Sequence, residues 1–157
     1  MKRGAIIGII AGAVALVLVL LAVSFFAGRN AGLNEFLPEE IDLPENMSSI
    51  NSVTENILQS LNDNNYSSFS KDFSDRIKTI LNEQSFTEVR NLILETSGKY
   101  ISKETPKSYE IEGYIAYDYS CEFEKEKVFV TISFSQDLKK VEGILFDSDN
   151  LREATNS

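Results

Sequence analysis

The sequence contains no histidine and no tryptophan, and its 157 residues include a single cysteine, Cys121. Without histidine, the chain lacks the commonest general base and the commonest transition-metal ligand of proteins. A single cysteine can form neither an intramolecular disulfide nor a zinc site of the cysteine type. Because Cys121 lies among apolar neighbours with no histidine to activate it, we interpret it as a buried, inert thiol. The sequence therefore predicts no catalytic constellation, no metal site and no cofactor.

Positive charge is also scarce, since 15 Lys and Arg stand against 24 Asp and Glu, for a net charge of −9. Without Lys2 and Arg3, the rest of the chain carries −11. This excess of negative charge repels phosphate backbones and excludes nucleic acid as a partner. The carboxylates are scattered, and no spacing of Asp and Asn resembles a calcium loop.

Charge is absent altogether from residues 4–28, GAIIGIIAGAVALVLVLLAVSFFAG. As a helix, residues 4–27 would extend about 36 Å, enough to cross the ~30 Å hydrocarbon core of a bilayer. The apolar run is too long for a cleaved secretory signal, and bulky Phe25 stands where signal cleavage needs a small residue. We therefore predict a retained transmembrane anchor that contacts the membrane lipid bilayer through residues 4–28.

The charges that flank this anchor predict its orientation. Lys2 and Arg3 precede it, whereas Arg29 is followed by a run of acidic residues. The positive-inside rule then places residues 1–3 in the cytoplasm and the domain outside the cell membrane. The protein is expected to be single-pass.

Small residues recur inside the anchor at Gly4, Gly8 and Gly12. A stripe at this spacing lets two helix backbones approach closely, so one interpretation is a homodimer packed through the anchor. The other interpretation is that these glycines contact only lipid. In addition, Arg3-Gly4-Ala5-Ile6 resembles the cleavage motif of archaeal prepilin-like proteins, which makes a pilin-like surface subunit a further alternative.

The remaining chain divides into a juxtamembrane linker, one domain and a short tail, at residues 29–45, 46–151 and 152–157. Apolar residues at helical spacing predict helices over residues 48–61, 74–81 and 85–97. Ser85 is the expected N-cap of the third helix, and Gly98 is its expected stop.

After Gly98 the apolar period becomes two, which is typical of strands. Strands are expected over residues 99–112, with a break at Pro106, and over 115–123, 128–134 and 141–145. A charged turn at Glu124 to Lys127 sets Tyr119 opposite Ile132 in the predicted register. The fold class is α+β, with about three helices packed on one face of a curved antiparallel meander of three to four strands.

Two groups of side chains in this meander are candidate binding surfaces. On the face away from the helices, Phe129 would pair with Phe146 and lie near Ile144, forming an apolar patch for a dimer or another partner. Alternatively, the linker or the C-terminal residues cover that patch. On the helix side, Tyr117 and Tyr119 are candidate pocket residues that donate hydroxyls to a ligand, or aromatic core residues.

The order of these elements, with the texts LNDNNYSSFSKDFSDRIKTIL and EFEKEKVFVTISFSQDLKKVEGILF, resembles small extracytoplasmic domains related to the nuclear transport factor 2-like (cystatin-like) superfold. The resemblance covers residues 50–148. It implies a conical pocket between sheet and helices, and dimers made through the outer sheet face. Members include isomerases, dehydratases and many domains without chemistry.

We therefore expect a single-span membrane protein whose extracytoplasmic domain is a non-enzymatic binding or protein-interaction module. Its partner would be a second copy of the chain, or a protein or small molecule that the sequence does not identify. The alternative is a small-molecule hydrolase or isomerase using the pocket of the same superfold. That alternative requires a buried carboxylate with a raised pKa inside the pocket.

Overall fold

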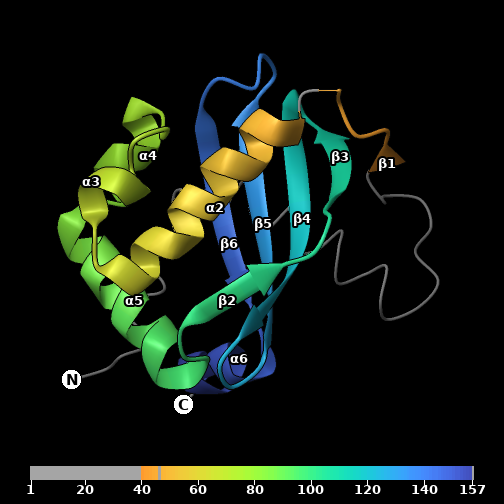
Figure 1. The fold of residues 1–157 in the computed structure, drawn as a ribbon. Coiled ribbons are helices and arrows are strands. Elements are labelled where there is room, and N and C mark those ends of the chain that lie inside the picture. The colour runs from red at the N-terminus through yellow and green to blue at the C-terminus, as the bar shows by residue number, and fades with distance from the viewer. Residues whose placement is uncertain (1–39, 46, 157) are drawn as a thin grey trace.

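The computed structural model describes residues 40–45 and 47–156 (Figure 1). The predicted anchor, including Gly4, Gly8 and Gly12, lies outside the described residues, as does most of the predicted linker. Within the described part of the chain, no helix combines the length and the apolar character needed to cross a membrane.

The described residues form a mixed α+β fold, which confirms the predicted class. The sequence predicted about three helices and three to four strands, whereas the structure has five helices and a six-stranded sheet among the described residues. In chain order the elements are β1 (Glu40–Ile41), α2 (Met47–Asp63), α3 (Tyr66–Phe69), α4 (Asp75–Ile80), α5 (Glu83–Thr96), β2 (Tyr100–Lys103), β3 (Lys107–Ile111), β4 (Tyr114–Phe123), β5 (Lys127–Ser135), β6 (Val141–Asp147) and α6 (Asp149–Asn156).

Helix α2 buries one apolar face, as its sequence period predicts, with Ile50, Ile57 and Leu58 almost inaccessible to solvent. Helix α5 begins two residues before the predicted N-cap, because the Asn82 side chain accepts a hydrogen bond from the Ser85 N–H at 3.1 Å. The predicted stop at Gly98 is confirmed. Its φ of +80° is a left-handed conformation that glycine adopts without strain.

The strands form an antiparallel sheet in the order β1-β3-β4-β5-β6, and β2 pairs with β4 beside β3 (Figure 1). The two strands before β4 therefore share one of its edges, and they are separated by the predicted break at Pro106. Helix α2 packs across one face, here called the inner face, on which Tyr117, Tyr119 and Val130 are fully buried. The opposite side is the outer face.

The hairpin between β4 and β5 turns one residue earlier than predicted. Phe123 N–H donates to the Glu126 carbonyl at 3.0 Å, and Tyr119 lies opposite Val130 rather than Ile132. This is a shift of two residues. Because side chains alternate with a period of two, each strand keeps its predicted face.

The predicted pairing of β5 with β6 is wrong in a way that changes faces. Val130 lies opposite Phe146 and Ile132 opposite Ile144, so these β6 residues share the inner face with their partners. The register shifts beyond Ser133, and this irregularity adds one residue to β6. A shift of one residue moves every side chain of a strand to the other face. The three residues of the predicted partner patch therefore do not share the outer face: Phe129 lies there, opposite Asp147.

The C-terminal residues, predicted as a tail from residue 152, belong to helix α6 in the structure. Its one buried side chain, Leu151, joins the hydrophobic core. The domain therefore continues beyond its predicted end at residue 151.

Candidate functional site

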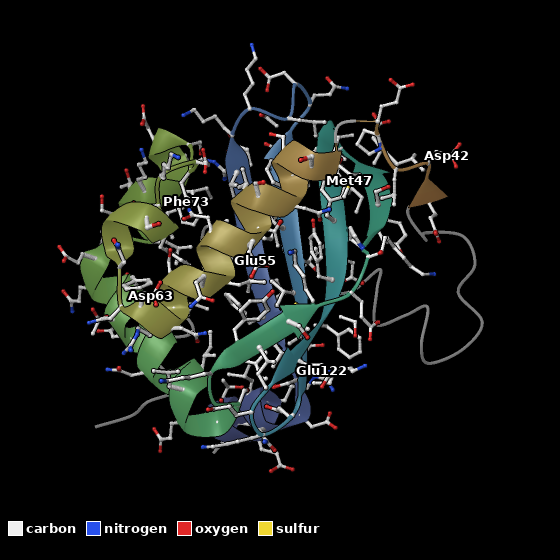
Figure 2. The ribbon with its side chains drawn as sticks, viewed as in Figure 1. Asp42, Met47, Glu55, Asp63, Phe73 and Glu122 are labelled. Atoms are coloured by element: carbon white, nitrogen blue, oxygen red, sulfur yellow. The ribbon has the colours of Figure 1, made fainter. Side chains whose placement is uncertain are left out.

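Three tyrosines lie on the inner face beneath α2, and they are here called the tyrosine cluster. Tyr117 and Tyr119 come from β4, the central strand, and Tyr100 comes from β2, which pairs with β4. All three are at least 95 % buried. Figure 2 shows α2 with Glu55 lying over these strands. The predicted inward direction of Tyr117 and Tyr119 is confirmed, and the structure adds Tyr100.

The hydroxyl of Tyr119 is fully paired with α2. It accepts a hydrogen bond from Thr54 Oγ1 at 3.2 Å and donates one to Asn51 Oδ1 at 3.2 Å. Burial raises the pKa of Tyr119 to about 12, although the bond from Thr54 acts in the opposite direction. This tyrosine therefore remains protonated over the physiological range and joins α2 to the sheet.

The hydroxyl of Tyr100 lies at the edge of the cluster, where it donates to Glu55 Oε2 at 2.8 Å. Lys103 Nζ contacts the same oxygen at 2.6 Å. Burial and the bond to Glu55 both raise the pKa of Tyr100. Asn62 of α2 also binds both backbone groups of Tyr100, accepting from its N–H at 3.0 Å and donating to its carbonyl at 2.8 Å. These contacts dock β2 against the helix.

The hydroxyl of Tyr117 differs from the other two. It is fully buried and has no hydrogen-bond partner among the described residues. The ring is edge-on to Phe134, with centroids 5.7 Å apart, and burial raises the pKa of the phenol. A buried hydroxyl without a partner costs about 1–3 kcal/mol, so this position holds an unused donor and acceptor in the protein interior.

Cys121 follows Tyr119 on the same face and is completely buried, as predicted. Burial raises the pKa of its thiol to about 12. Because the thiolate is the reactive form, such a cysteine is a poor nucleophile at neutral pH. Within the described residues, no group of three or more Cys, Asp or Glu side chains is placed to hold a metal ion.

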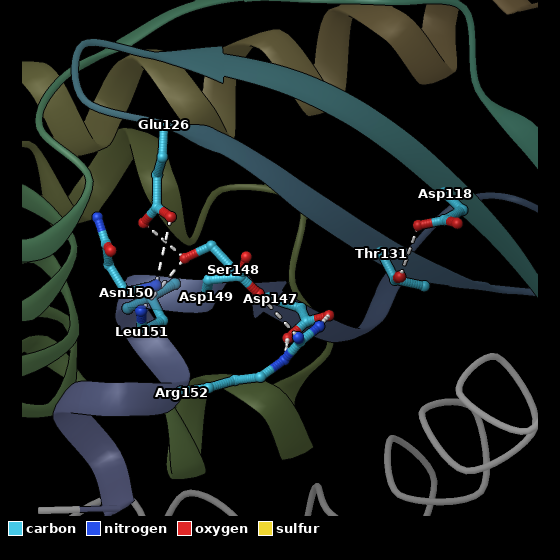
Figure 3. Close-up of polar contacts among 9 residues, drawn as sticks. All are labelled: Asp118, Glu126, Thr131, Asp147, Ser148, Asp149, Asn150, Leu151 and Arg152. Carbon is cyan, nitrogen blue, oxygen red and sulfur yellow. Dashed lines mark hydrogen bonds and ion pairs between the residues drawn. The ribbon is translucent and has the colours of Figure 1, made fainter. Parts of the chain in front are cut away.

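The sequence did not predict a second polar network, which surrounds Glu126 at the β4–β5 hairpin (Figure 3). Its carboxylate accepts hydrogen bonds from Ser148 Oγ at 2.7 Å and from Asn150 N–H at 3.3 Å. It also accepts one from Ser97 Oγ at 2.6 Å. The network therefore joins the end of α5, the hairpin and the start of α6. The sequence analysis missed α6, although the run Ser148-Asp149-Asn150 is a helix-start signal that could have indicated it, and no local signal indicates the contact with Glu126.

The comparisons with known proteins identify a family. The model of the family described as "Protein of unknown function (DUF3887)" matches residues 54–143, more than half of the chain. The chain therefore belongs to the DUF3887 family. The matched region includes the whole tyrosine cluster and excludes α6. No curated protein and no solved structure matches the chain.

Proposed function

We propose that this DUF3887 protein is a single-span membrane protein whose extracytoplasmic domain is a non-enzymatic module that binds a small molecule at Tyr117. The sheet-plus-helix architecture is compatible with the nuclear transport factor 2-like superfold, whose members bind ligands between the sheet and the helices. The observation that carries the proposal is the buried, unpartnered hydroxyl of Tyr117. The proposed ligand has an apolar body and one polar group that pairs with this hydroxyl.

The contrast between neighbouring tyrosines supports this assignment. Tyr119 is two residues away on the same strand face, and its hydroxyl has two partners from α2. At Tyr117, phenylalanine would keep the ring contact with Phe134 and avoid the cost of the unpaired hydroxyl. A ligand that pairs with this hydroxyl explains why the position holds tyrosine rather than phenylalanine, because the hydrogen bond that offsets the cost of burying the hydroxyl forms only in the bound state.

The enzymatic alternative has less support from the cluster. A pocket hydrolase or isomerase needs a buried acid or base whose pKa is shifted toward neutrality. The carboxylate in contact with the cluster is Glu55, whose side chain is 48 % exposed and is paired with Lys103. The other polar groups in contact with the cluster are the Thr54 hydroxyl, the amides of Asn51 and Asn62, and the Cys121 thiol. These groups favour recognition of a ligand over proton transfer.

The proposed attachment to the membrane is supported by the uncharged run at residues 4–28. The start of the described domain bears on the pilin-like alternative. A pilin-like subunit would continue its anchor helix directly into the domain. Here β1 at Glu40–Ile41 is an extended strand paired with β3, and it separates α2 from the preceding residues. This arrangement favours a membrane-attached domain over a filament subunit. In the proposal, Gly4, Gly8 and Gly12 allow two anchors to pair in the bilayer.

The test is native mass spectrometry of the full chain purified from its own membrane, alone and as Tyr117→Phe. The matched control is Tyr114→Phe, since Tyr114 lies on the same strand and points to the outer face. We expect a small molecule that co-purifies with the wild type and the control and is lost from Tyr117→Phe. A wild-type chain without any bound molecule, or equal retention by Tyr117→Phe, would refute the binding proposal.

A further inference from the structure

We propose that Asn65 is a modification site, at which an oligosaccharide is linked to the side-chain nitrogen. This inference rests on the extracytoplasmic location in the proposed function, because asparagine-linked sugars belong to exported chains. It does not depend on the binding of a ligand at Tyr117, which is buried on the inner face of the sheet.

The motif that carries the inference is Asn65-Tyr66-Ser67, which matches the acceptor pattern Asn-x-Ser or Asn-x-Thr. Three-residue matches also arise by chance, so the position in the fold decides their value. Here the motif begins in the polar turn that joins α2 to α3. Asn65 and Ser67 are exposed, whereas Tyr66 is half-buried and its ring lies 5.7 Å from that of Phe86. The two residues that define the acceptor therefore face solvent, and the residue between them anchors the turn.

The hydrogen bond of the Asn65 side chain orients its amide for this chemistry. Its oxygen Oδ1 accepts from Ser68 N–H at 3.0 Å, which makes Asn65 the N-cap of α3, and its backbone is extended with φ −118° and ψ 90°. Because Oδ1 and Nδ2 diverge from the same carbon, the nitrogen that receives the sugar is directed away from the helix end. A sugar on Nδ2 leaves Oδ1 and the cap intact, so the modification is compatible with the folded turn.

Within residues 47–155, the other exposed asparagines lack the serine or threonine two positions later; they are Asn64, Asn82, Asn91 and Asn150. Asn82 is the closest structural match, because it is also an N-cap and accepts from Ser85 N–H at 3.1 Å. A second copy of the motif, Asn46-Met47-Ser48, begins outside the described residues and forms no part of the proposal. Motif and exposure therefore coincide at Asn65 alone within this range.

The turn lies at the far end of α2 from the start of the described chain. Figure 2 shows Asp42 and Met47 toward one end of this helix and Asp63 at the other. A helix of 17 residues is about 25 Å long. A sugar at Asn65 is therefore displaced from the end of the domain nearest β1, and it leaves the proposed attachment to the membrane unobstructed.

The sugar donor in this proposal is a lipid-linked oligosaccharyl diphosphate. A bond forms between Asn65 Nδ2 and the anomeric carbon of the first sugar, and the bond between that carbon and the diphosphate oxygen breaks. The lipid diphosphate leaves with the electron pair, and the amide nitrogen releases one proton. The chain supplies the acceptor, and a membrane glycosyltransferase supplies the catalysis. Because helices of four residues are unstable in isolation, the motif is open to that enzyme while the chain crosses the membrane.

The test is peptide mapping by mass spectrometry of the full chain purified from its own membrane. We expect the peptide that contains Asn65 to carry the mass of an oligosaccharide. Ser67→Ala and Asn65→Asp should each abolish that mass, and aspartate retains the N-cap, so the fold is kept. Ser67→Thr preserves the motif and should keep the sugar. The matched control is Asn82→Asp, which changes the same kind of cap outside the motif and should leave the sugar in place.

An unmodified Asn65 in the wild type would overturn the proposal, as would a sugar found at Asn46 alone or one that persists in Ser67→Ala. Labelling of Asp137→Cys by a membrane-impermeant maleimide in intact cells separates this failure from a failure of the proposed function. If the cysteine is labelled while Asn65 is unmodified, the modification alone is overturned. If the cysteine is not labelled and Asn65 is unmodified, the extracytoplasmic location is overturned as well.

Discussion

The two central tyrosines of β4 should respond in opposite directions when their hydroxyls are removed. Tyr119→Phe removes two hydrogen bonds and leaves the fully buried Thr54 Oγ1 without its partner. Net hydrogen bonds contribute about 1 kcal/mol each, and an orphaned buried hydroxyl costs about 1–3 kcal/mol. We therefore expect Tyr119→Phe to lower the free energy of unfolding by about 2–3 kcal/mol.

Tyr117→Phe removes a buried hydroxyl that has no partner among the described residues. The ring, the contact with Phe134 and the core volume are retained. The expected result is a free energy of unfolding that rises by about 1 kcal/mol, through loss of the desolvation cost. A buried tyrosine-to-phenylalanine change that stabilises the protein is the signature of a side chain kept for binding rather than for folding.

The assay is urea unfolding of the full chain in detergent, followed by circular dichroism, with both variants measured beside the wild type. The protein is unfolded and refolded first to remove any co-purified molecule, because a bound ligand would itself stabilise the wild type. An unchanged dependence on urea concentration shows that the variants differ in stability alone. Destabilisation of Tyr117→Phe by more than about 1 kcal/mol would refute the reasoning, since it would show that its hydroxyl is paired in the folded chain.

Three further measurements follow from the structure and the sequence. Glu126→Ala removes the acceptor of two buried serine hydroxyls, Ser97 at the end of α5 and Ser148 at the start of α6, and should lower the free energy of unfolding by about 2–4 kcal/mol. Glu122→Ala on the same hairpin removes an exposed ion pair and should change it by less than about 1 kcal/mol, and equal losses would contradict this reasoning. Burial raises the pKa of Cys121 from 9.0 to about 12. The contribution of this thiol to the free energy of unfolding is fully present below pH 9 and is lost as the pH rises toward 12. Cys121→Ala should therefore lose less stability than the wild type over that interval, and identical pH profiles would exclude the effect. Finally, a membrane-impermeant maleimide added to intact cells should label Asp137→Cys, and should label Lys2→Cys only after lysis; the reverse pattern would invert the proposed topology.

Local patterns in the sequence were sufficient for the class of the fold and for most of its elements, although they missed β1, α3 and α6. The helical period of α2, the alternation in β4 and β5, and the chain breaks at Gly98 and Pro106 all appear where predicted. These signals depend on neighbours within a few residues, because backbone preferences and one-sided burial act at that range. They also place Tyr117 and Tyr119 on the inner face, since a two-residue slip in pairing leaves the faces unchanged.

Other features were decided only by the tertiary structure. In β6 both alternate sets of residues include apolar side chains, so the sequence could not choose between Leu145 and Ile144 as inward positions. The irregularity beyond Ser133 made that choice by shifting the register one residue. The hydrogen-bond networks of Tyr100 and Glu126 were also decided by the tertiary structure, because their partners lie on elements far away in sequence.

The tyrosine cluster shows this division within one site. The inward direction of Tyr117 and Tyr119 is a local property, because it follows from the alternation of side chains along β4. The presence or absence of a partner for each hydroxyl depends on how α2 lies across the sheet, which places Thr54 and Asn51 at Tyr119 and no described group at Tyr117. Packing between distant segments determines that placement, because hydrogen bonds require partners within about 3.5 Å, a condition that no local pattern encodes.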